Sequence, residues 1–267
     1  MWGSDEPGTK YDPHGRYRRC RVVTGVYAGR IALTRERKKD MKYPGLYVIG
    51  LTGGIASGKS TVSGMLRELG AVIIDADEVS REVVAPGTRG WRQIVDTFGP
   101  GVLRPDGSIN RRKLGGMVFG DKDALDKLDS IVHPLVMARV EDTLAKLSRG
   151  VTEGESGTGE GTKVVVLDAP LLFEVGADRL VDEVWVVSVD PETQMERLIR
   201  RDGYSKAEAL SRMTSQMPLP EKERLSDVVI DNRGDPESTR RQVLAYWEEI
   251  QGKVRNPDQT KGEERLR

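Results

Sequence analysis

Five short apolar runs recur along the chain, and each is followed by a turn or by a segment with helical spacing. They lie at residues 46–51, 72–74, 164–167, 184–189 and 228–230. Runs of Val, Ile and Leu with little alternation are typical of strands buried on both faces of a parallel sheet. Because helical segments lie between the runs, the pattern predicts an α/β fold with a parallel five-stranded sheet flanked by helices.

The interval at residues 90–149 has helical spacing of its apolar residues, as at Trp91, Ile94, Val95 and Phe98. A parallel crossover needs only about a dozen residues, so this interval predicts an inserted helical subdomain. Residues 150–162 are rich in Gly, Glu, Ser and Thr without apolar periodicity, which indicates a flexible surface loop.

The chain of 267 residues carries 42 Lys and Arg against 42 Asp and Glu. The charge is distributed unevenly, since residues 1–42 have a net charge of +6, residues 43–250 of −8 and residues 251–267 of +2. A net-acidic central domain argues against binding of nucleic acid or of an anionic membrane by bulk charge. No apolar run reaches the roughly eighteen residues of a membrane span. The composition and charge therefore leave small molecules as the class of substrate to consider.

The basic N-terminal arm, residues 1–42, and the polar tail, residues 251–267, lie outside the predicted domain at 43–250. We expect the tail to be disordered. The arm lacks the apolar segment of a secretory signal, so we interpret it either as disordered or as preceding a true initiator at Met41. The single cysteine, Cys20, allows no intrachain disulfide and favours a reducing compartment. We therefore expect a cytoplasmic protein.

A phosphate-binding sequence follows the first predicted strand. Residues 53–60 read Gly-Gly-Ile-Ala-Ser-Gly-Lys-Ser and match G-x-x-x-x-G-K-[ST], with a helical stretch after them. Glycines let backbone N–H groups converge on phosphate oxygens, and the helix start adds partial positive charge. Lys59 is placed to reach the β- and γ-phosphates, and the Ser60 hydroxyl to ligate Mg²⁺. The motif predicts nucleotide binding, and the chain has no Asn-Lys-x-Asp guanine reader of a GTPase.

Further motifs suggest a family. Asp75-Ala76-Asp77, which follows the second apolar run, resembles dephospho-coenzyme A kinase when it is taken together with the phosphate loop and its Leu51-Thr52 lead-in. Other segments resemble that family in order and spacing: His133-Pro134, the strand-end residues 168–174, the lid-like residues 197–216 and the turn at 231–234. The resemblance covers about residues 46–250, and the loop at 150–162 departs from it.

The resemblance implies a P-loop NTPase-type kinase that phosphorylates the ribose 3′-hydroxyl of dephospho-coenzyme A, using ATP and Mg²⁺, in the last step of coenzyme A biosynthesis. The helical subdomain would bind dephospho-coenzyme A, and residues 190–217 would form a helical lid. We expect small-molecule partners only, no nucleic acid or membrane, and a monomer or weak homo-oligomer.

The resemblance also assigns roles to residues. Catalytic roles fall to Asp77 as the base and to Lys59, Arg197 and Arg201 as positive charges around the phosphoryl group. Nucleotide-binding positions are Gly54, Ala56, Ser57, Gly58, Lys59, Ser60, Thr61, Asn232 and Gly234. Asp75, Arg81, His133 and Arg139 would contact dephospho-coenzyme A, and Ser60 and Asp168 would hold Mg²⁺.

Simpler interpretations stay open for several of these residues. Either aspartate of the Asp-Ala-Asp motif is suited to cap the next helix, and Asp168 to cap a turn. The arginines at 197–201 would otherwise form a solvated helix face, and Arg81 and Arg139 would make surface ion pairs. His133 would shape a pocket rather than transfer protons. Two other functions also stay open: another small-molecule kinase, such as a nucleoside monophosphate kinase, or a regulatory nucleotide-binding module without catalysis.

Overall fold

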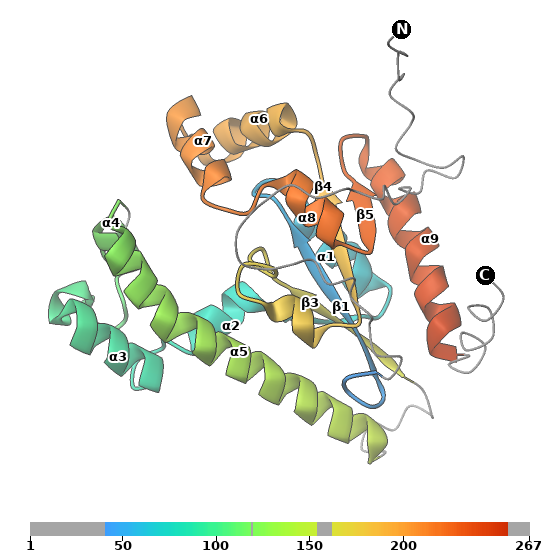
Figure 1. Cartoon of the computed structure of the whole chain (residues 1–267), viewed down its shortest axis with the longest axis horizontal. Helices are drawn as coiled ribbons and strands as arrows, with labels where there is room; N and C mark the ends of the chain where they lie inside the picture. The colour runs from blue at the N-terminus through green and yellow to red at the C-terminus, as the bar shows by residue number, and fades with distance from the viewer. Residues whose placement is uncertain (1–40, 119, 154–161, 256–267) are drawn as a thin grey trace, which may run out of the picture.

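The computed structural model describes residues 41–118, 120–153 and 162–255 (Figure 1). Along the chain, the elements are β1 (Leu46–Gly53), α1 (Lys59–Glu68), β2 (Val72–Asp75), α2 (Ala76–Glu82), α3 (Arg89–Phe98), η1 (Pro100–Val102), α4 (Arg111–Val118), α5 (Lys122–Thr152), β3 (Lys163–Asp168), η2 (Ala177–Leu180), β4 (Glu183–Ser188), α6 (Pro191–Asp202), α7 (Lys206–Thr214), α8 (Leu219–Leu225), β5 (Val228–Asp231) and α9 (Pro236–Arg255). Nearly all of the predicted arm, most of the 150–162 loop and the end of the tail lie outside the described residues.

The five strands form one parallel sheet in the order β2-β3-β1-β4-β5, so the predicted fold class is confirmed. Alternate residues of each strand enter two cores, because successive side chains point to opposite faces of a sheet. Leu46 and Val48 of β1 pack under α2, α5 and α8, whereas Ile49 and Leu51 pack against α1 and α9. Both faces are covered, which explains why the strands are apolar almost throughout.

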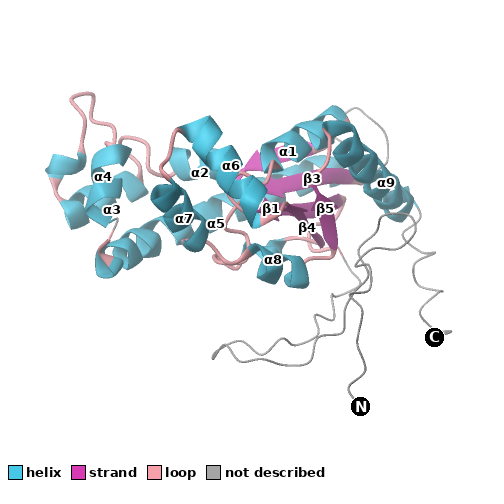
Figure 2. Ribbon diagram, turned by 90° about the horizontal axis from the view of Figure 1, so that it is seen from above, coloured by secondary structure: helices cyan, strands magenta, loops and turns pink. Residues whose placement is uncertain are grey.

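The inserted helices build a third core of their own, at the far end of the molecule from α9 (Figure 1, Figure 2). Ile94 of α3 and Leu114 of α4 are buried there against α5. Trp91 also donates its ring N–H to the carbonyl of Gly107, 2.8 Å away. The region predicted at 90–149 is therefore a separate helical layer, and α5 links it to the sheet because the far half of α5 packs in the first sheet core.

Two predicted boundaries were wrong. The helix α5 continues to Thr152, so the loop predicted from residue 150 begins three residues later. The His133-Pro134 motif lies inside this same helix. The helix α9 runs to Arg255, into the tail predicted to be disordered from residue 251, because Ile250 is buried and Val254, one turn later, packs beside it in the second core.

Candidate nucleotide and acceptor site

The phosphate loop connects β1 to α1 through a backbone that requires small residues. Ala56 and Gly58 have positive φ angles of 59° and 90°, and Gly58 is the N-cap of α1. The amide of Ser57 donates to the carbonyl of Gly54 at 3.0 Å, which closes the turn. The next residues, Lys59, Ser60 and Thr61, form the first turn of α1. Their amides therefore lie at the positive end of the helix, where anions bind.

Asn232 fixes this loop from the end of β5. Its Nδ2 donates to the carbonyl of Ser57 at 2.7 Å, and its Oδ1 accepts from Thr239 Oγ1 at 2.7 Å. The side chain is buried, so both bonds are needed to satisfy its amide. Gly234 follows in the same turn, beside Ser238. The structure thus places Asn232 against the phosphate loop, where it supports the backbone.

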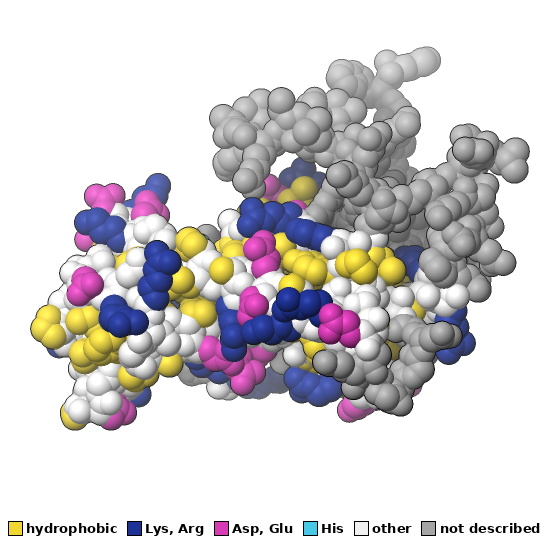
Figure 3. Space-filling model, turned by 90° about the horizontal axis from the view of Figure 1, so that it is seen from below, with side chains coloured by type: hydrophobic (Ala, Val, Ile, Leu, Met, Phe, Trp, Pro, Cys, Tyr) yellow, Lys and Arg dark blue, Asp and Glu magenta, His cyan; other side chains and the backbone are white. Residues whose placement is uncertain are grey.

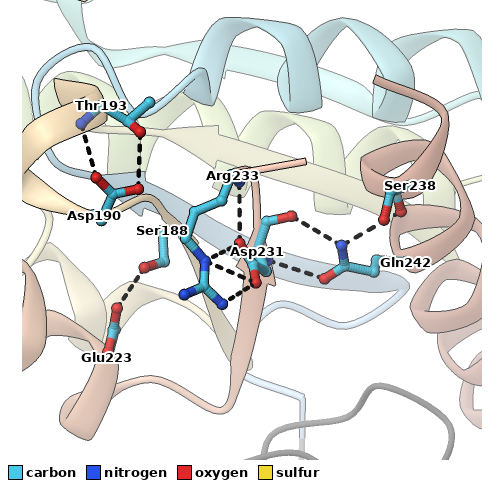
Figure 4. A network of polar contacts seen from close by, with 8 residues as sticks. All are labelled: Ser188, Asp190, Thr193, Glu223, Asp231, Arg233, Ser238 and Gln242. Atoms are coloured by element: carbon cyan, nitrogen blue, oxygen red, sulfur yellow. Dashed lines mark hydrogen bonds and ion pairs between the residues drawn. The ribbon is translucent and has the colours of Figure 1, made fainter. Parts of the chain in front are cut away.

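Polar contacts at the ends of β4 and β5 stabilise that turn (Figure 4). Asp231 accepts hydrogen bonds from the backbone and guanidinium of Arg233, and Gln242 bonds both the N–H and the C=O of Asp231 at 2.9 and 2.8 Å. Nearby, Asp190 accepts from the amide and hydroxyl of Thr193 and so caps α6. These contacts set the positions of the two segments that bracket the loop.

Asp168 lies at the carboxyl end of β3, between the ends of β1 and β2. It pairs in register with Leu51 on one side and with Asp75 on the other. The carboxylate is buried and forms an ion pair with the ammonium of Lys59. The predicted phosphate-loop lysine and the predicted metal ligand are therefore in direct contact.

Helix α6 contacts the phosphate loop through two side chains, those of Gln194 and Arg197. Gln194 is buried and donates to the carbonyl of Ile55 at 2.8 Å. Arg197 Nη2 donates to the carbonyl of Asn232 at 3.0 Å, and its Nη1 lies 3.4 Å from the carbonyl oxygen of Ser57. The segment after α7 also contacts the phosphate loop, because Gln216 Oε1 accepts from the amide of Ile55 at 3.2 Å.

Other predicted cations lie elsewhere in this structure. Arg201 is exposed and makes a bidentate ion pair with Asp202 at 2.8 Å. Arg139, also exposed, lies 3.3 Å from Glu82 and 3.8 Å from Asp142, as in the surface ion-pair interpretation. Neither residue reaches the phosphate loop or the cavity described next.

A cavity of about 280 Å³ lies between α2, the helical layer and the segment after Asp168. Its walls are mainly apolar, with Ile94, Leu114 and Val132 from the helical layer. Asp77 lines it from the first turn of α2, and Pro170 lines it from the turn beyond β3. Asp75 does not line it. Its Oδ1 instead accepts from the amides of Asp77 and Glu78, so it caps α2.

Polar groups converge on the same cavity. His133 lines it, with Nε2 3.5 Å from Asp129 Oδ1, and burial raises the pKa of Asp129 although His133 opposes the shift. Arg111 also lines the cavity. Burial and the charge of Arg81 lower the pKa of Arg111, whereas Asp77 raises it. Arg111 and Asp77 thus share one cavity and influence each other electrostatically, which suits an acceptor that carries phosphates.

Comparison with known proteins identifies this arrangement. A family model described as dephospho-CoA kinase matches residues 47–237, most of the chain. The chain belongs to the dephospho-CoA kinase family. The dephospho-CoA kinase of Carboxydothermus hydrogenoformans is 50% identical over 199 residues, which are 74% of this chain and 92% of that protein. That of Geobacter sulfurreducens is 50% identical over 200 residues, covering 75% and 96%.

Solved structures agree with the family assignment. A Thermus thermophilus protein, TT1252, superposes with a TM-score of 0.60 at 30% identity, over 78% of this chain and 99% of its own. A dephospho-CoA kinase from Campylobacter jejuni superposes with a TM-score of 0.53 at 25% identity, over 77% and 98%. The protein is therefore a kinase, an enzyme of the transferase class. Among the described residues, no helix is both long and apolar enough to cross a membrane.

The two predicted metal ligands, Ser60 and Asp168, have the chemistry of ligands for a hard cation. Ser60 and Asp168 offer a hydroxyl and a carboxylate, and both are oxygen donors. Within the described ranges, no group of three or more His, Cys, Asp or Glu forms a complete metal site. Mg²⁺ typically uses one or two protein ligands together with substrate phosphates. A partial protein site of this kind suits a kinase.

Sequence reasoning missed Arg111, Asp129, Gln194 and Lys222. Arg111 and Asp129 belong to no motif and face the cavity only through the packing of the helical layer. Gln194 stood inside a segment interpreted as a basic lid face. The available signal was its position four residues before Leu198, on the apolar side of the helix. Lys222, whose side chain is fully buried, gave no sequence signal, because a lysine in a polar segment is normally exposed.

Proposed function

We propose that this kinase transfers the γ-phosphoryl group of ATP to the ribose 3′-hydroxyl of dephospho-coenzyme A through the residues described above. Membership of the family establishes ATP-dependent phosphorylation of dephospho-CoA, a reaction of coenzyme A biosynthesis. One observation carries the residue-level proposal. The cavity that holds Asp77 is walled by residues directly after Asp168, and Asp168 contacts the phosphate-loop lysine.

The base would be Asp77. It accepts the proton of the ribose 3′-hydroxyl as the oxygen forms a bond to the γ-phosphorus, and the bond from that phosphorus to the bridging oxygen of ADP breaks. Phosphoryl transfer asks the protein mainly for positioning and for positive charge. The loop amides and Lys59 supply that charge on one side of the phosphates. Arg197, already in contact with the loop carbonyls, supplies it from α6.

Ser60 and Asp168 would hold Mg²⁺, which neutralises charge on the transferred group when it is bound. Asp168 is buried at a strand end, so its carboxylate is fixed before the substrates arrive. Ser60 in the first turn of α1 faces the same edge of the sheet. Both positions are oxygen donors next to the phosphate loop, which supports their assignment.

The cavity would receive dephospho-coenzyme A. Apolar walls suit the pantetheine arm, and Arg81 and Arg111 near Asp77 suit the diphosphate. His133 and Asp129 offer polar contacts within the apolar wall. Arg201 and Arg139 are exposed, make surface ion pairs, and contact neither the phosphate loop nor the cavity in this structure. The proposal therefore rests on the other cations.

The wider setting also follows from the sequence. We expect a cytoplasmic enzyme, as a monomer or a weak homo-oligomer, with neither nucleic acid nor membrane as a partner. Figure 3 shows Lys and Arg side chains interspersed with Asp and Glu over the described part of one face. A mixed surface of this kind does not present the large basic field that nucleic-acid binding uses.

A substrate panel tests the acceptor. The purified enzyme is assayed for ADP release with dephospho-coenzyme A, AMP and shikimate, with and without Mg²⁺. We expect turnover with dephospho-coenzyme A, dependent on Mg²⁺, and a product phosphorylated at the 3′-oxygen by ³¹P NMR. Preference for AMP would show that AMP, and not dephospho-coenzyme A, is the phosphoryl acceptor. Absence of turnover with every acceptor would favour a regulatory nucleotide-binding module.

A pair of variants tests the base. Asp77→Asn keeps the shape of the side chain, and the backbone amide of residue 77 still donates to Asp75 Oδ1, so the fold should persist. We expect kcat to fall by roughly 10²- to 10⁴-fold. Glu78→Gln is the matched control, because Glu78 is exposed, lies in the same helical turn and does not line the cavity. Unchanged kcat in Asp77→Asn, or an equal loss in Glu78→Gln, would remove Asp77 from the mechanism.

A further inference from the structure

Lys222 of α8 is fully buried, although lysine almost never is. Its Nζ donates to the carbonyl of Pro170 at 2.6 Å and lies 2.9 Å from Glu174 Oε1. Burial lowers the pKa of Lys222, and the Glu174 carboxylate opposes that shift. An ion pair withdrawn from water adds little net stability compared with apolar side chains of the same size. Stability alone therefore does not account for this lysine.

The Lys222 ammonium contacts the turn that follows Asp168. Pro170 is two residues beyond Asp168, and its carbonyl also accepts from Thr52 Oγ1 at 3.1 Å. Thr52 is buried in β1 and immediately precedes the phosphate loop. One carbonyl oxygen thus joins the end of β1, the turn after β3 and α8.

Glu174 extends these contacts to the chain leaving α7. Its Oε1 accepts from the amide of Met217 at 3.0 Å as well as pairing with Lys222. The preceding residue, Gln216, accepts from the amide of Ile55 in the phosphate loop. The Lys222–Glu174 pair therefore contacts both the Asp168 turn and the exit of the predicted lid, yet it does not line the cavity.

We propose that Lys222 and Glu174 act together as positioning residues for phosphoryl transfer. Their ion pair holds the turn after Asp168, the end of β1 and the exit of the α6–α7 segment in the one arrangement in which the metal ligand and the phosphate loop face each other. This inference rests on the proposed function and deepens it. It predicts a larger loss of turnover than of acceptor binding, because the pair contacts the cavity wall at Pro170, whereas most of the other lining residues come from α2 and the helical layer.

The first test is Lys222→Met, which keeps the length of the side chain and removes its charge and donors. We expect kcat to fall by about 10- to 100-fold, since small misplacement of reacting groups costs that much. The KM for dephospho-coenzyme A should stay within about threefold. Glu174→Met should lower kcat in the same way, and it decides the question alone if Lys222→Met does not fold. A folded variant with kcat within twofold of wild type would overturn the proposal.

A double variant separates positioning from independent effects. If the pair acts as a unit, Lys222→Met combined with Glu174→Met should lose no more turnover than the worse single variant. If the fold-losses in kcat of the two single variants multiply in the double variant, the two residues act independently and the shared role is contradicted. Lys253→Met is the matched control, because it breaks another lysine–glutamate pair, with Glu183 at 2.6 Å, away from the phosphate loop. It should leave kcat within twofold, and a loss equal to that of Lys222→Met would overturn the proposal.

These outcomes are distinguishable from failure of the proposed function. If the wild-type enzyme does not phosphorylate dephospho-coenzyme A, the proposed function is wrong. If it does, and both single variants keep the wild-type kcat, only the positioning role is wrong.

Discussion

Replacement of Gly58 by alanine perturbs the phosphate loop at its tightest point. The residue has a φ of 90°, which L side chains rarely adopt. An added Cβ would lie 2.0 Å from Asn232 Nδ2 and 3.2 Å from Asn232 Cγ. Both the backbone and the neighbouring side chain must therefore change when alanine is introduced.

The expected cost has two parts. Holding alanine in a left-handed conformation costs about 1–2 kcal/mol. Displacing the buried amide of Asn232 from the Ser57 carbonyl and the Thr239 hydroxyl leaves polar groups unsatisfied, at about 1–3 kcal/mol. We therefore expect Gly58→Ala to lower the free energy of unfolding by about 2–5 kcal/mol, a large part of the 5–15 kcal/mol of a typical domain.

Urea unfolding of Gly58→Ala, Asn232→Ala and the double variant measures both parts. Asn232→Ala removes the atoms that the new Cβ would meet, so the double variant should cost at least about 1 kcal/mol less than the sum of the singles. Gly64→Ala is the control, because a Cβ there meets nothing within 4 Å and alanine favours the helix by about 0.5–1 kcal/mol. A Gly58→Ala cost below about 0.5 kcal/mol, or strictly additive costs, would refute the reasoning.

Three further predictions concern other parts of the molecule. Arg197→Ala should raise the KM for ATP at least about tenfold in steady-state kinetics, and Arg201→Ala should raise it less than threefold, because of these two arginines only Arg197 contacts the phosphate loop. A larger increase in KM for Arg201→Ala than for Arg197→Ala would contradict this. Ile94→Ala should cost about 2–4 kcal/mol in urea unfolding, since the side chain is 1% exposed in the third core; a cost below about 1 kcal/mol would show that this core is loosely packed. Burial raises the pKa of Glu183, but Lys253 and hydrogen bonds outweigh it and lower that pKa overall. The resulting stability is present above the unfolded-state value of about 4.3 and is lost as pH falls through the lower folded-state value. Thermal unfolding from pH 7 to pH 3 should therefore show a smaller acid loss in Glu183→Gln than in wild type, and equal losses would exclude this contribution.

Local spacing made the sheet and the phosphate loop predictable. The strands β1, β3 and β4 are buried on both faces, so their apolar runs stand out in the sequence, and the glycines of the loop are dictated by backbone angles such as that of Gly58. The resemblance drew attention to Asp168, and the structure places it at the carboxyl end of β3, at the edge where parallel sheets bind ligands.

Contacts between distant segments were not predictable in this way. Gln194 meets Ile55 across 139 residues of sequence, and Lys222 meets Pro170 across 52. Such contacts depend on how α6 and α8 pack on the sheet, which no periodicity encodes. Helix boundaries failed for a related reason, since the extension of α9 to Arg255 depends on an apolar contact of Val254 with the sheet core.

The two carboxylates of the Asp-Ala-Asp motif divide their roles because of backbone geometry. A side chain that caps a helix must turn back to accept from the first amides, and Asp75 does so with Asp77 and Glu78 at 2.8 and 3.2 Å. Its Oδ1 therefore belongs to the helix start. The same cap fixes the first turn of α2, and two residues later that turn presents Asp77 to the cavity. Either aspartate satisfied the sequence pattern, but of the two only Asp77 lines the cavity, which is why we propose it as the base.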